Sequence, residues 1–316
     1  MLDSQPLTSG ATAVVIVTYN SGDVIADCLD SLPKALCGLE TAAVLVVDNA
    51  STDDTAAVVA AHGGALRARF VPLEGNLGYA SAINHARRLA PPYDLLLVLN
   101  PDTVLEPGSV QRLAAALSAP GRGIAVPRLV GLSGDSTMSL RREPTLGTAV
   151  GDAVLGGDRA ARWGWGERIQ RRERYAHAGA IDWATGAVAL IRADCDESVG
   201  DWNESFFLYS EETDFMLRAQ DAGFATWYVP DAVVYHRGGE SANAPELWAL
   251  VMRNKARLYS SRHGRLASAL YFSTLLVGEL ARAGFGKPRS RAAVRGMLAD
   301  RGAVFSGRGC SRRAAK

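Results

Sequence analysis

The segment Leu95–Asp102 reads LLLVLNPD, in which five apolar residues lead directly into Asn, Pro and Asp. Two earlier segments have the same form, AVVIVTYN at Ala13–Asn20 and AAVLVVDN at Ala42–Asn49. Apolar runs without polar alternation are typical of strands buried on both faces of a parallel sheet. In an open α/β sheet, ligands bind beyond the carboxyl ends of the strands. The three polar ends therefore predict one shared site.

Helices alternate with these strands in the pattern of a doubly wound, mostly parallel α/β sheet. Ser21 is expected to cap a first helix that runs toward Leu32 and that Pro33 helps to end. The other expected helices are Thr55–Ala61, Tyr79–Leu89, Ser109–Leu117 and Glu211–Gln220, and the later strands or extended segments are Leu66–Val71, Ile124–Val130, Phe224–Val229 and Ala232–Tyr235, with ordered structure also expected over Ile181–Arg192. Gly131–Gly179 is expected to be an irregular excursion beside the sheet, and the chain after about residue 240 to be helical.

The charge of the chain is unevenly distributed. With 316 residues and 48% apolar content, it can bury the core of one large domain or of two. Arg282–Lys316 holds ten basic residues and one acid, so residues 1–281 carry −8 of the total net charge of +1. Basic tails bind polyanions such as anionic lipid surfaces or nucleic acid. No recognition motif for nucleic acid accompanies this one, so a nucleic-acid partner is not expected.

Cysteine usage and hydropathy indicate a cytoplasmic protein. The four cysteines form no C-x-x-C pair, which predicts reduced thiols and no metal site built on sulfur. Met1–Gly10 lacks the basic start and apolar core of a signal peptide. The longest apolar stretch, Leu266–Leu280, contains Ser, Thr and Glu and is shorter than the ~20 residues that span a bilayer.

Two carboxylates at the strand ends are candidate ligand groups. Asp102 could bind Mg²⁺ or Mn²⁺ together with a diphosphate, or it could simply shape a turn with Asn100. Asp48 lies too far upstream to cap the next helix, and a carboxylate there suits a base imide or a ribose hydroxyl. Gly75–Gly78 is either a ligand loop or a plain turn.

The later part of the chain offers a candidate base and a second metal ligand. Glu211 and Glu212 stand beside an aromatic cluster, where a glutamate could deprotonate a hydroxyl. The alternative is that these acids only favour a helix N-terminus, with Asp214 and Arg218 paired at i, i+4. His236 could complete a metal site with Asp102, or it could be an ordinary surface histidine.

Six short motifs stand in a fixed order: Thr18-Tyr19-Asn20, Val47–Asp53, Gly75–Ala80, Leu99–Asp102, Trp183–Ala187 and Phe206–Arg218. This order resembles the family 2 glycosyltransferases, and most closely their bacterial rhamnosyltransferase-like branch. The likeness covers about residues 12–240 and implies a GT-A fold. The implied organisation is an N-terminal extension (1–11), a nucleotide-sugar half (12–130), an acceptor half (131–240), a C-terminal helical region (241–301) and a disordered basic tail (302–316).

The resemblance implies a place for each donor-side residue. Thr18, Tyr19 and Asp48 would surround the nucleotide base and ribose. Asn76 and Gly78 would lie beside the donor.

The resemblance also implies the metal ligands and the catalytic base. Asp102 stands at the last acid of the family's Asp-x-Asp metal motif, and His236 stands at a second ligand of the divalent cation, Mg²⁺ or Mn²⁺. Glu212 occupies the position of the catalytic base in an inverting displacement.

The acceptor and the transferred sugar would border Thr185 and Gly186, together with Trp183 and Glu211. Two departures from the family pattern stand out. Asn100, on the donor side, replaces the first acid of the metal motif, which predicts weaker cation affinity. Glu212 replaces the usual Asp and is one methylene longer, so Glu211 is a candidate substitute for it.

The function implied is transfer of a sugar, rhamnose or another hexose, from a nucleotide-diphosphate donor to a glycan or lipid-linked acceptor in cell-surface polysaccharide or glycoconjugate synthesis. Asn100 leaves open a catalytically silent sugar-nucleotide-binding module of the same fold. A dinucleotide-dependent oxidoreductase is disfavoured, because no G-x-G-x-x-G follows the first strand. Leu266–Phe285, the basic tail and the tryptophans at 163 and 165 are consistent with peripheral attachment to an anionic surface, the inner face of the plasma membrane. The alternative is that these helices pack on the domain and that the tail only aids solubility.

Overall fold

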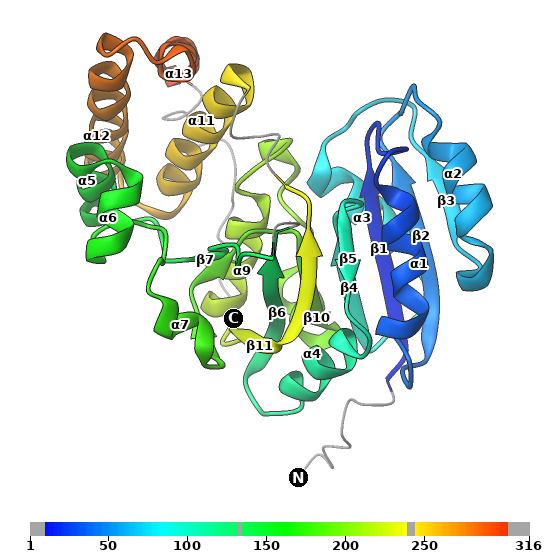
Figure 1. Ribbon diagram of the computed structural model, residues 1–316. Helices are drawn as coiled ribbons and strands as arrows, with labels where there is room; N and C mark the ends of the chain where they lie inside the picture. Colours follow the sequence, from blue (N-terminus) through cyan, green and yellow to red (C-terminus); the bar gives the residue numbers. More distant parts are fainter. Residues whose placement is uncertain (1–9, 132–133, 239–243, 303–316) are drawn as a thin grey trace. The chain divides into compact units, whose positions relative to one another are not determined.

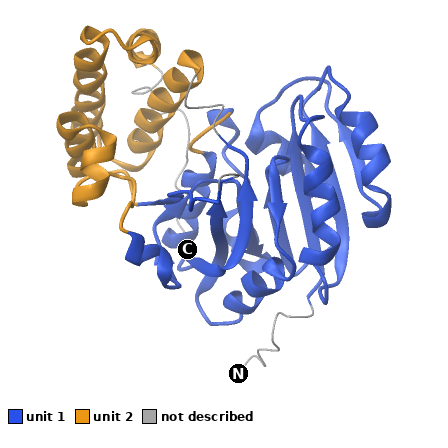
Figure 2. Cartoon of the chain, viewed as in Figure 1, with its two compact units in different colours: residues 1–141, 172–207, 211–238 blue, residues 142–171, 208–210, 239–316 orange. Residues whose placement is uncertain are grey.

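The computed structural model describes residues 10–131, 134–238 and 244–302 (Figure 1). The chain forms two compact units (Figure 2). Unit 1 consists of residues 1–141, 172–207 and 211–238, and unit 2 of residues 142–171, 208–210 and 239–316. Residues 142–171, expected in the acceptor half, thus pack in unit 2 with the C-terminal helices. The expected N-terminal extension and basic tail fall almost wholly outside the described residues.

The strands all lie in unit 1. They are β1 Thr12–Thr18, β2 Thr41–Asp48, β3 Arg69–Pro72, β4 Leu95–Leu99, β5 Thr103–Leu105, β6 Arg122–Val130, β7 Leu140–Arg141, β8 Gly179–Ile181, β9 Trp183–Ala184, β10 Val188–Arg192 and β11 Ala225–His236. Within the described residues they form a nine-stranded sheet in the order β3-β2-β1-β4-β10-β6-β11-β5, with β8 paired to β11, and a small sheet of β7 and β9.

Helices of unit 1 are α1 Ile25–Ala35, α2 Thr55–His62, α3 Tyr79–Leu89, α4 Ser109–Leu117, α7 Arg172–Ala176, α8 Ala193–Val199 and α9 Glu211–Asp221, with the short 3-10 helices η2 Gly64–Leu66 and η3 Glu204–Phe206. Helices of unit 2 are α5 Leu146–Leu155, α6 Gly157–Trp163, α11 Pro245–Arg262, α12 Arg265–Gly284 and α13 Pro288–Ala299.

The three apolar runs form neighbouring parallel strands, as predicted. Every residue of β1 and β4 is buried, because helices cover both faces of the sheet. Thr18 of β1 is level with Asp48 of β2, and Ile16 of β1 is level with Leu99 of β4. The polar ends of the three strands therefore share one edge of the sheet. The predicted doubly wound α/β fold is confirmed.

Two later strands bring the second half of unit 1 to the same edge. β10 runs antiparallel to β4, so that Val188 pairs with Leu99 and the residues before β10 lie beside Asn100. β11 runs antiparallel to β5, and its last residue, His236, pairs with Thr103. This topology brings His236 next to the Asn100–Asp102 turn.

The start of α1 differs from the prediction. Ser21 does not cap the helix with its side chain, because its hydroxyl bonds with Tyr19 while its backbone carbonyl accepts from Val24 and Ile25. Pro33 lies inside α1, which continues to Ala35. Proline removes one backbone donor, and only the last turn of the helix remains to be completed after it.

Two further predictions were wrong. Gly131–Gly179 is not an irregular excursion, because α5, α6 and α7 form within it. The two expected strands near the end of unit 1 are one strand, β11, whose register shifts between Val229 and Val233. Pro230 lies in this shift, where its missing N–H costs no ladder hydrogen bond.

Unit 2 has its own apolar core, formed by α5, α11, α12 and α13 and including Met252, Tyr271 and Phe272. Tyr259 stacks on Tyr271 with ring centroids 3.9 Å apart. The buried Lys255 ammonium pairs with Glu167 at 2.5 Å. Among the described residues, no helix is both long enough and apolar enough to cross a membrane.

Candidate functional site

Asp48 is held rigidly at the end of β2. One carboxylate oxygen accepts the Thr18 hydroxyl at 2.7 Å and the Ser51 hydroxyl at 2.5 Å, and the other accepts the Ser51 N–H at 2.8 Å. Asp48 is only 3% exposed and Thr18 is fully buried. A carboxylate has about four acceptor positions, so one remains on the second oxygen. Thr18 thus positions Asp48, and a ligand could reach Asp48 only at that edge.

The loops after β1 and β2 hold each other in place. The Asn20 N–H donates to the Ser51 hydroxyl, and the Asn20 side-chain oxygen accepts the Thr52 N–H, both at 2.8 Å. Tyr19, between Thr18 and Asn20, remains 54% exposed. An exposed aromatic ring on a braced loop is suited to stacking on a planar group such as a nucleobase.

Gly78 allows two segments to approach closely. Its φ is +91°, and a Cβ placed on it would lie 2.4 Å from the Phe207 carbonyl oxygen, to which Tyr79 donates its N–H at 2.8 Å. The Asn76 side chain accepts the Gly78 N–H at 3.2 Å and thereby shapes the turn. Asn49 accepts the Leu77 N–H at 3.2 Å and ties this loop to the end of β2.

Replacing Gly78 with Ala is expected to lower the free energy of unfolding by about 2–4 kcal/mol, since positive φ and the clash with Phe207 both oppose a side chain. Urea denaturation measures the loss. Gly75→Ala is the matched control, because a Cβ there meets nothing within 4 Å, and its change should stay within about 0.5 kcal/mol. Equal losses in the two variants would contradict the assigned role of Gly78.

Asp102 and His236 lie side by side. A carboxylate oxygen of Asp102 is 3.3 Å from His236 Nε2 and accepts the Gly238 N–H at 3.0 Å. The two side chains are 24% and 18% exposed. Burial alone would raise the pKa of Asp102, but the hydrogen bond and charge of His236 and the Gly238 N–H outweigh it and hold that pKa below its usual value. The pair offers one ionised carboxylate and one imidazole facing partly open space.

Within the described residues, no group of three or more His, Cys, Asp or Glu is arranged to hold a metal ion. Asp102 and His236 are a pair of such groups that lie together here. Mg²⁺ and Mn²⁺ accept carboxylate and imidazole and commonly keep substrate phosphates in their shell. Asp102 and His236 would therefore suit a divalent cation of this kind.

The turn that carries Asp102 rests on a buried support. The Asn100 carbonyl accepts the Thr103 hydroxyl at 2.7 Å, and the Asn100 N–H donates to Ala187 at 2.9 Å. Cys28 lies beneath, with its sulfur 3.8 Å from the Thr103 hydroxyl, and burial raises the pKa of its thiol to about 12. Cys28 is therefore an inert packing group and not a nucleophile.

Glu212 sits against Gly186. A Cβ on Gly186 would lie 3.1 Å from Glu212 Cβ and 3.7 Å from its carboxyl carbon, so glycine leaves room for the glutamate. The Tyr79 hydroxyl is 3.5 Å from the Gly186 carbonyl oxygen. Gly186 is thus close both to Glu212 and to a tyrosine from α3.

The pKa of the Tyr79 hydroxyl depends on the carboxylates near it. Its pKa is raised well above the usual value, first by burial and then by the charges of Glu211, Glu212 and Asp102. These three acids come from two segments more than a hundred residues apart in the chain. Asp102, His236, Glu212 and Gly186 therefore gather around one place.

The structure also locates the remaining residues singled out in the sequence. Trp183 is 8% exposed and lies in the small sheet, and the Thr185 N–H donates to Ser139 at 3.1 Å. Glu211 is 3% exposed. Asp214 pairs with Arg218 at 2.7 Å, as the helix-pair alternative predicted.

Comparisons with known proteins decide the family. The family model described as "Glycosyl transferase family 2" matches residues 13–170. The chain is also 31% identical over 254 residues to the N-acetylglucosaminyl-diphospho-decaprenol L-rhamnosyltransferase of Mycobacterium tuberculosis, covering 77% of this chain and 81% of that protein. The chain belongs to glycosyl transferase family 2. It is an enzyme of the rhamnosyltransferase-like branch, not a silent binding module.

Solved structures confirm the GT-A fold of this family 2 glycosyltransferase. A mannosyltransferase of Pyrobaculum calidifontis, solved with GDP-mannose and Mn²⁺, aligns with a TM-score of 0.57 at 17% identity, over 98% of this chain and 79% of that one. GalNAc-T7, solved with UDP, GalNAc and Mn²⁺, aligns with a TM-score of 0.54 at 13% identity, over 80% and 51%. At these identities the likeness is one of fold.

Three residues of the glycosyltransferase site were missed in the sequence. Ser51 gives Asp48 two of its three hydrogen bonds, Asn49 ties the Gly75–Gly78 loop to β2, and Tyr79 faces the acids. Ser51 and Asn49 directly follow a buried strand, which was an available signal. Tyr79 gave none, because an aromatic at a helix start is most often a packing residue.

Proposed function

We propose that this glycosyltransferase moves a sugar, rhamnose or another hexose, from a nucleotide diphosphate to a hydroxyl of a glycan or lipid-linked acceptor, with inversion at the anomeric carbon. The placement of Glu212 beside Gly186, facing the same tyrosine hydroxyl as Asp102, carries the proposal. The name of the M. tuberculosis relative, a transferase of L-rhamnose to N-acetylglucosaminyl-diphospho-decaprenol, supports this choice of donor and acceptor.

In the proposed step the acceptor oxygen attacks the anomeric carbon as the bond from that carbon to the diphosphate oxygen breaks. Glu212 takes the proton of the acceptor hydroxyl, and the nucleotide diphosphate leaves with the electron pair. One displacement inverts the configuration. Gly186 lets the acceptor approach Glu212 without a side chain in the way.

Asp102 and His236 are the proposed ligands of a divalent cation, Mg²⁺ or Mn²⁺. When bound, the cation offsets charge on the diphosphate. Two fold neighbours were solved with Mn²⁺, which supports this assignment. Asn100, in the same turn as Asp102, has an uncharged side chain. This is consistent with a cation that is held largely by the diphosphate of the nucleotide sugar.

The donor end of the site is assigned to the loops after β1, β2 and β3. Tyr19 would stack on the base, Asp48 would accept its imide or a ribose hydroxyl, and the Asn76–Gly78 turn would border the diphosphate. On the acceptor side we place Gly186 and Thr185, with Trp183 and the buried Glu211 behind them.

Asp48→Asn is expected to weaken binding of the matching nucleoside diphosphate by about 10- to 100-fold, the usual effect of losing a hydrogen bond to a charged group. Calorimetry with UDP, dTDP and GDP measures the dissociation constants. Asp54→Asn, an exposed change on the neighbouring loop, should leave them unchanged. A lower Tm with unchanged affinity would mean that Asp48 only holds its loop.

We place this reaction in cell-surface polysaccharide or glycoconjugate synthesis, at the inner face of the plasma membrane where a lipid-linked acceptor resides. The direct test incubates the enzyme and Mn²⁺ with dTDP-, UDP- and GDP-sugars and a diphospholipid-linked N-acetylglucosamine. Release of one nucleoside diphosphate together with a product of inverted configuration supports the proposal. A retained configuration, or no transfer from any of these donors, overturns it.

A further inference from the structure

One face of α12 in unit 2 is apolar and exposed. Leu266, Leu270, Val277 and Leu280 are 76%, 49%, 63% and 49% exposed. Their spacing of four, seven and three residues puts them on one side of a helix, over a length of about 21 Å. The opposite side of the helix is buried in the core of unit 2, so this stripe has no partner among the described residues. Phe285, 86% exposed, follows the helix.

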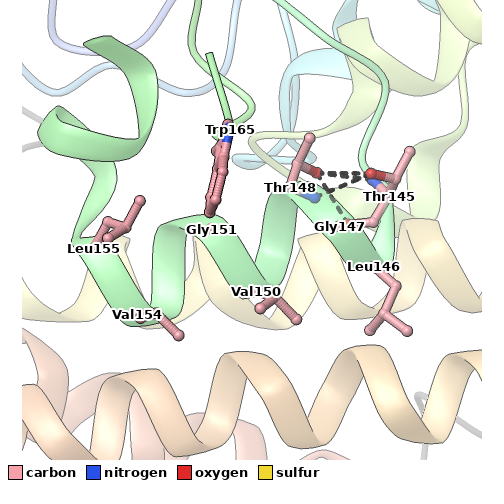
Figure 3. A pocket seen from close by; sticks show the side chains of 9 residues that line it. All are labelled: Thr145, Leu146, Gly147, Thr148, Val150, Gly151, Val154, Leu155 and Trp165. Carbon is pink, nitrogen blue, oxygen red and sulfur yellow. Dashed lines mark hydrogen bonds between the residues drawn. The ribbon is translucent and has the colours of Figure 1, made fainter. Parts of the chain in front are cut away.

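A second apolar surface of unit 2 lies on α5, which packs against α12. A Cβ on Gly278 of α12 would lie 3.1 Å from Ala153 Cβ of α5. The outer side of α5 and the Trp165 ring line an open groove of about 730 Å³, and Val150 and Val154 project from the same side of the helix (Figure 3). Both valines are exposed, at 45% and 76%.

Two tryptophans are exposed in the same unit, Trp163 at 62% and Trp165 at 65%. Gly151 fixes the segment that carries Trp165 against α5, because a Cβ there would lie 2.4 Å from the Trp165 carbonyl oxygen. The backbone of Trp165 is therefore held in place while its indole ring stays exposed. Tryptophan has an apolar body and a polar N–H and is favoured where a bilayer meets water.

The charge of the molecule is divided between the units. By sequence, the residues of unit 2 carry a net charge of +12, and those of unit 1 carry −11. Acids of unit 2 are largely engaged: Glu167 pairs with Lys255, and Glu279 pairs with Arg282. The exposed apolar residues are thus set in a strongly cationic unit.

We propose that unit 2 docks onto an anionic lipid bilayer through its exposed apolar side chains, with the α12 stripe, Phe285 and the two tryptophans entering the interfacial layer. This proposal deepens the proposed function, because it gives the enzyme a way to reach a lipid-linked acceptor. Apolar side chains on one helix face with basic residues around them are the usual composition of an interfacial anchor. Each basic residue near an anionic leaflet adds to the attraction.

The charge of unit 2 argues against a second copy of the chain as the partner, and the exposed apolar side chains argue against nucleic acid. A symmetric pair of chains joined through this surface would bring together two units of +12 each. Nucleic acid would satisfy the charge, but it would leave the leucines and valines of α12 exposed to water. A bilayer with anionic headgroups matches both the charge and the apolar stripe.

The test is flotation of the full chain with phosphatidylcholine vesicles, with and without phosphatidylglycerol. We expect flotation only with the anionic vesicles and its loss at high salt. Leu270→Gln with Val277→Gln should lower the partition coefficient by about 10-fold for each side chain. Leu298→Gln is the matched control, since Leu298 is also exposed in unit 2 (45%) but lies on α13. All these residues are on the surface, so the substitutions should leave the Tm unchanged. An unchanged Tm excludes misfolding as the cause of lost flotation.

Tryptophan fluorescence gives a second readout. A blue shift on adding anionic vesicles should disappear in the double variant Trp163→Phe, Trp165→Phe. Absence of flotation, or equal flotation of the α12 variant and the wild type, overturns the proposal. So does a stable dimer that Leu270→Gln dissociates, or tight binding of single-stranded DNA that competes with the vesicles.

The proposed function and the docking proposal fail separately. The α12 variants should keep full activity on a water-soluble N-acetylglucosaminyl diphosphate acceptor and lose activity only on a long-chain lipid acceptor in vesicles. A protein that binds vesicles but transfers no sugar refutes the proposed function and leaves docking intact. A protein that transfers sugar equally well to both acceptors after the α12 change refutes docking alone.

Discussion

Glu212→Gln is expected to lower kcat by about 10²- to 10⁴-fold with donor affinity unchanged, because a general base contributes about that much to the rate. Gln keeps the size of the side chain and its contact with Gly186 but cannot accept the proton of the acceptor hydroxyl. The proposed donor-binding groups, on the loops after β1 and β2, are not altered. The loss should therefore appear in the chemical step alone.

Single-turnover kinetics with a saturating nucleotide sugar measure this loss, and calorimetry measures donor binding. Glu211→Gln is the matched comparison, since the neighbouring carboxylate also acts on Tyr79 but is buried. If Glu211→Gln loses the activity and Glu212→Gln retains it, Glu211 is the base. A comparable loss of donor affinity in Glu212→Gln would show that this residue binds the donor and is not the base.

The sheet could be predicted from the sequence because its strands are buried on both faces. The runs Val14–Val17 and Leu95–Leu99 have no polar residue, and such a run is stable only between two covering layers. Helices with a clear start were also predicted well, as for Tyr79–Leu89 after a glycine with positive φ. Local chemistry and tertiary packing agree at these places.

The structure of 131–179 could not be predicted in this way. α5 contains Gly147 and Gly151, which have low helix propensity. The helix is stabilised by a capping box at Thr145 and by contacts with α12, more than a hundred residues later in the chain. Such contacts leave no periodic signal within the segment itself.

The candidate site, like the fold, could be predicted only in part from the sequence. Sequence reasoning offered the pairing of Asp102 with His236 only as one of two alternatives, and the resemblance favoured it. The sequence could not show that β11 runs antiparallel to β5, which brings the two side chains to 3.3 Å from each other. The support of Asp48 by Thr18 and Ser51 depends on the register of β1 and β2, which the sequence does not specify.

Asp102→Asn is expected to lower kcat/KM by about 10²- to 10³-fold at a fixed Mn²⁺ concentration, the usual effect of removing one group that stabilises charge on a leaving group. The amide keeps the shape of the side chain and an oxygen for the Gly238 N–H, so the turn should hold. What is lost is one of the two proposed protein ligands, and activity should require a much higher Mn²⁺ concentration.

A double-mutant cycle with His236→Ala tests whether the two residues act as one unit. If both hold the same cation, the double variant loses little more than either single variant. Asp23→Asn is the nearby control, because it breaks the exposed pair with Arg237, the next residue after His236, and should leave the Mn²⁺ dependence unchanged. Additive losses, or full activity of Asp102→Asn after chelation of metal, would mean that Asp102 and His236 form a structural pair and that the diphosphate leaves without a protein-bound cation.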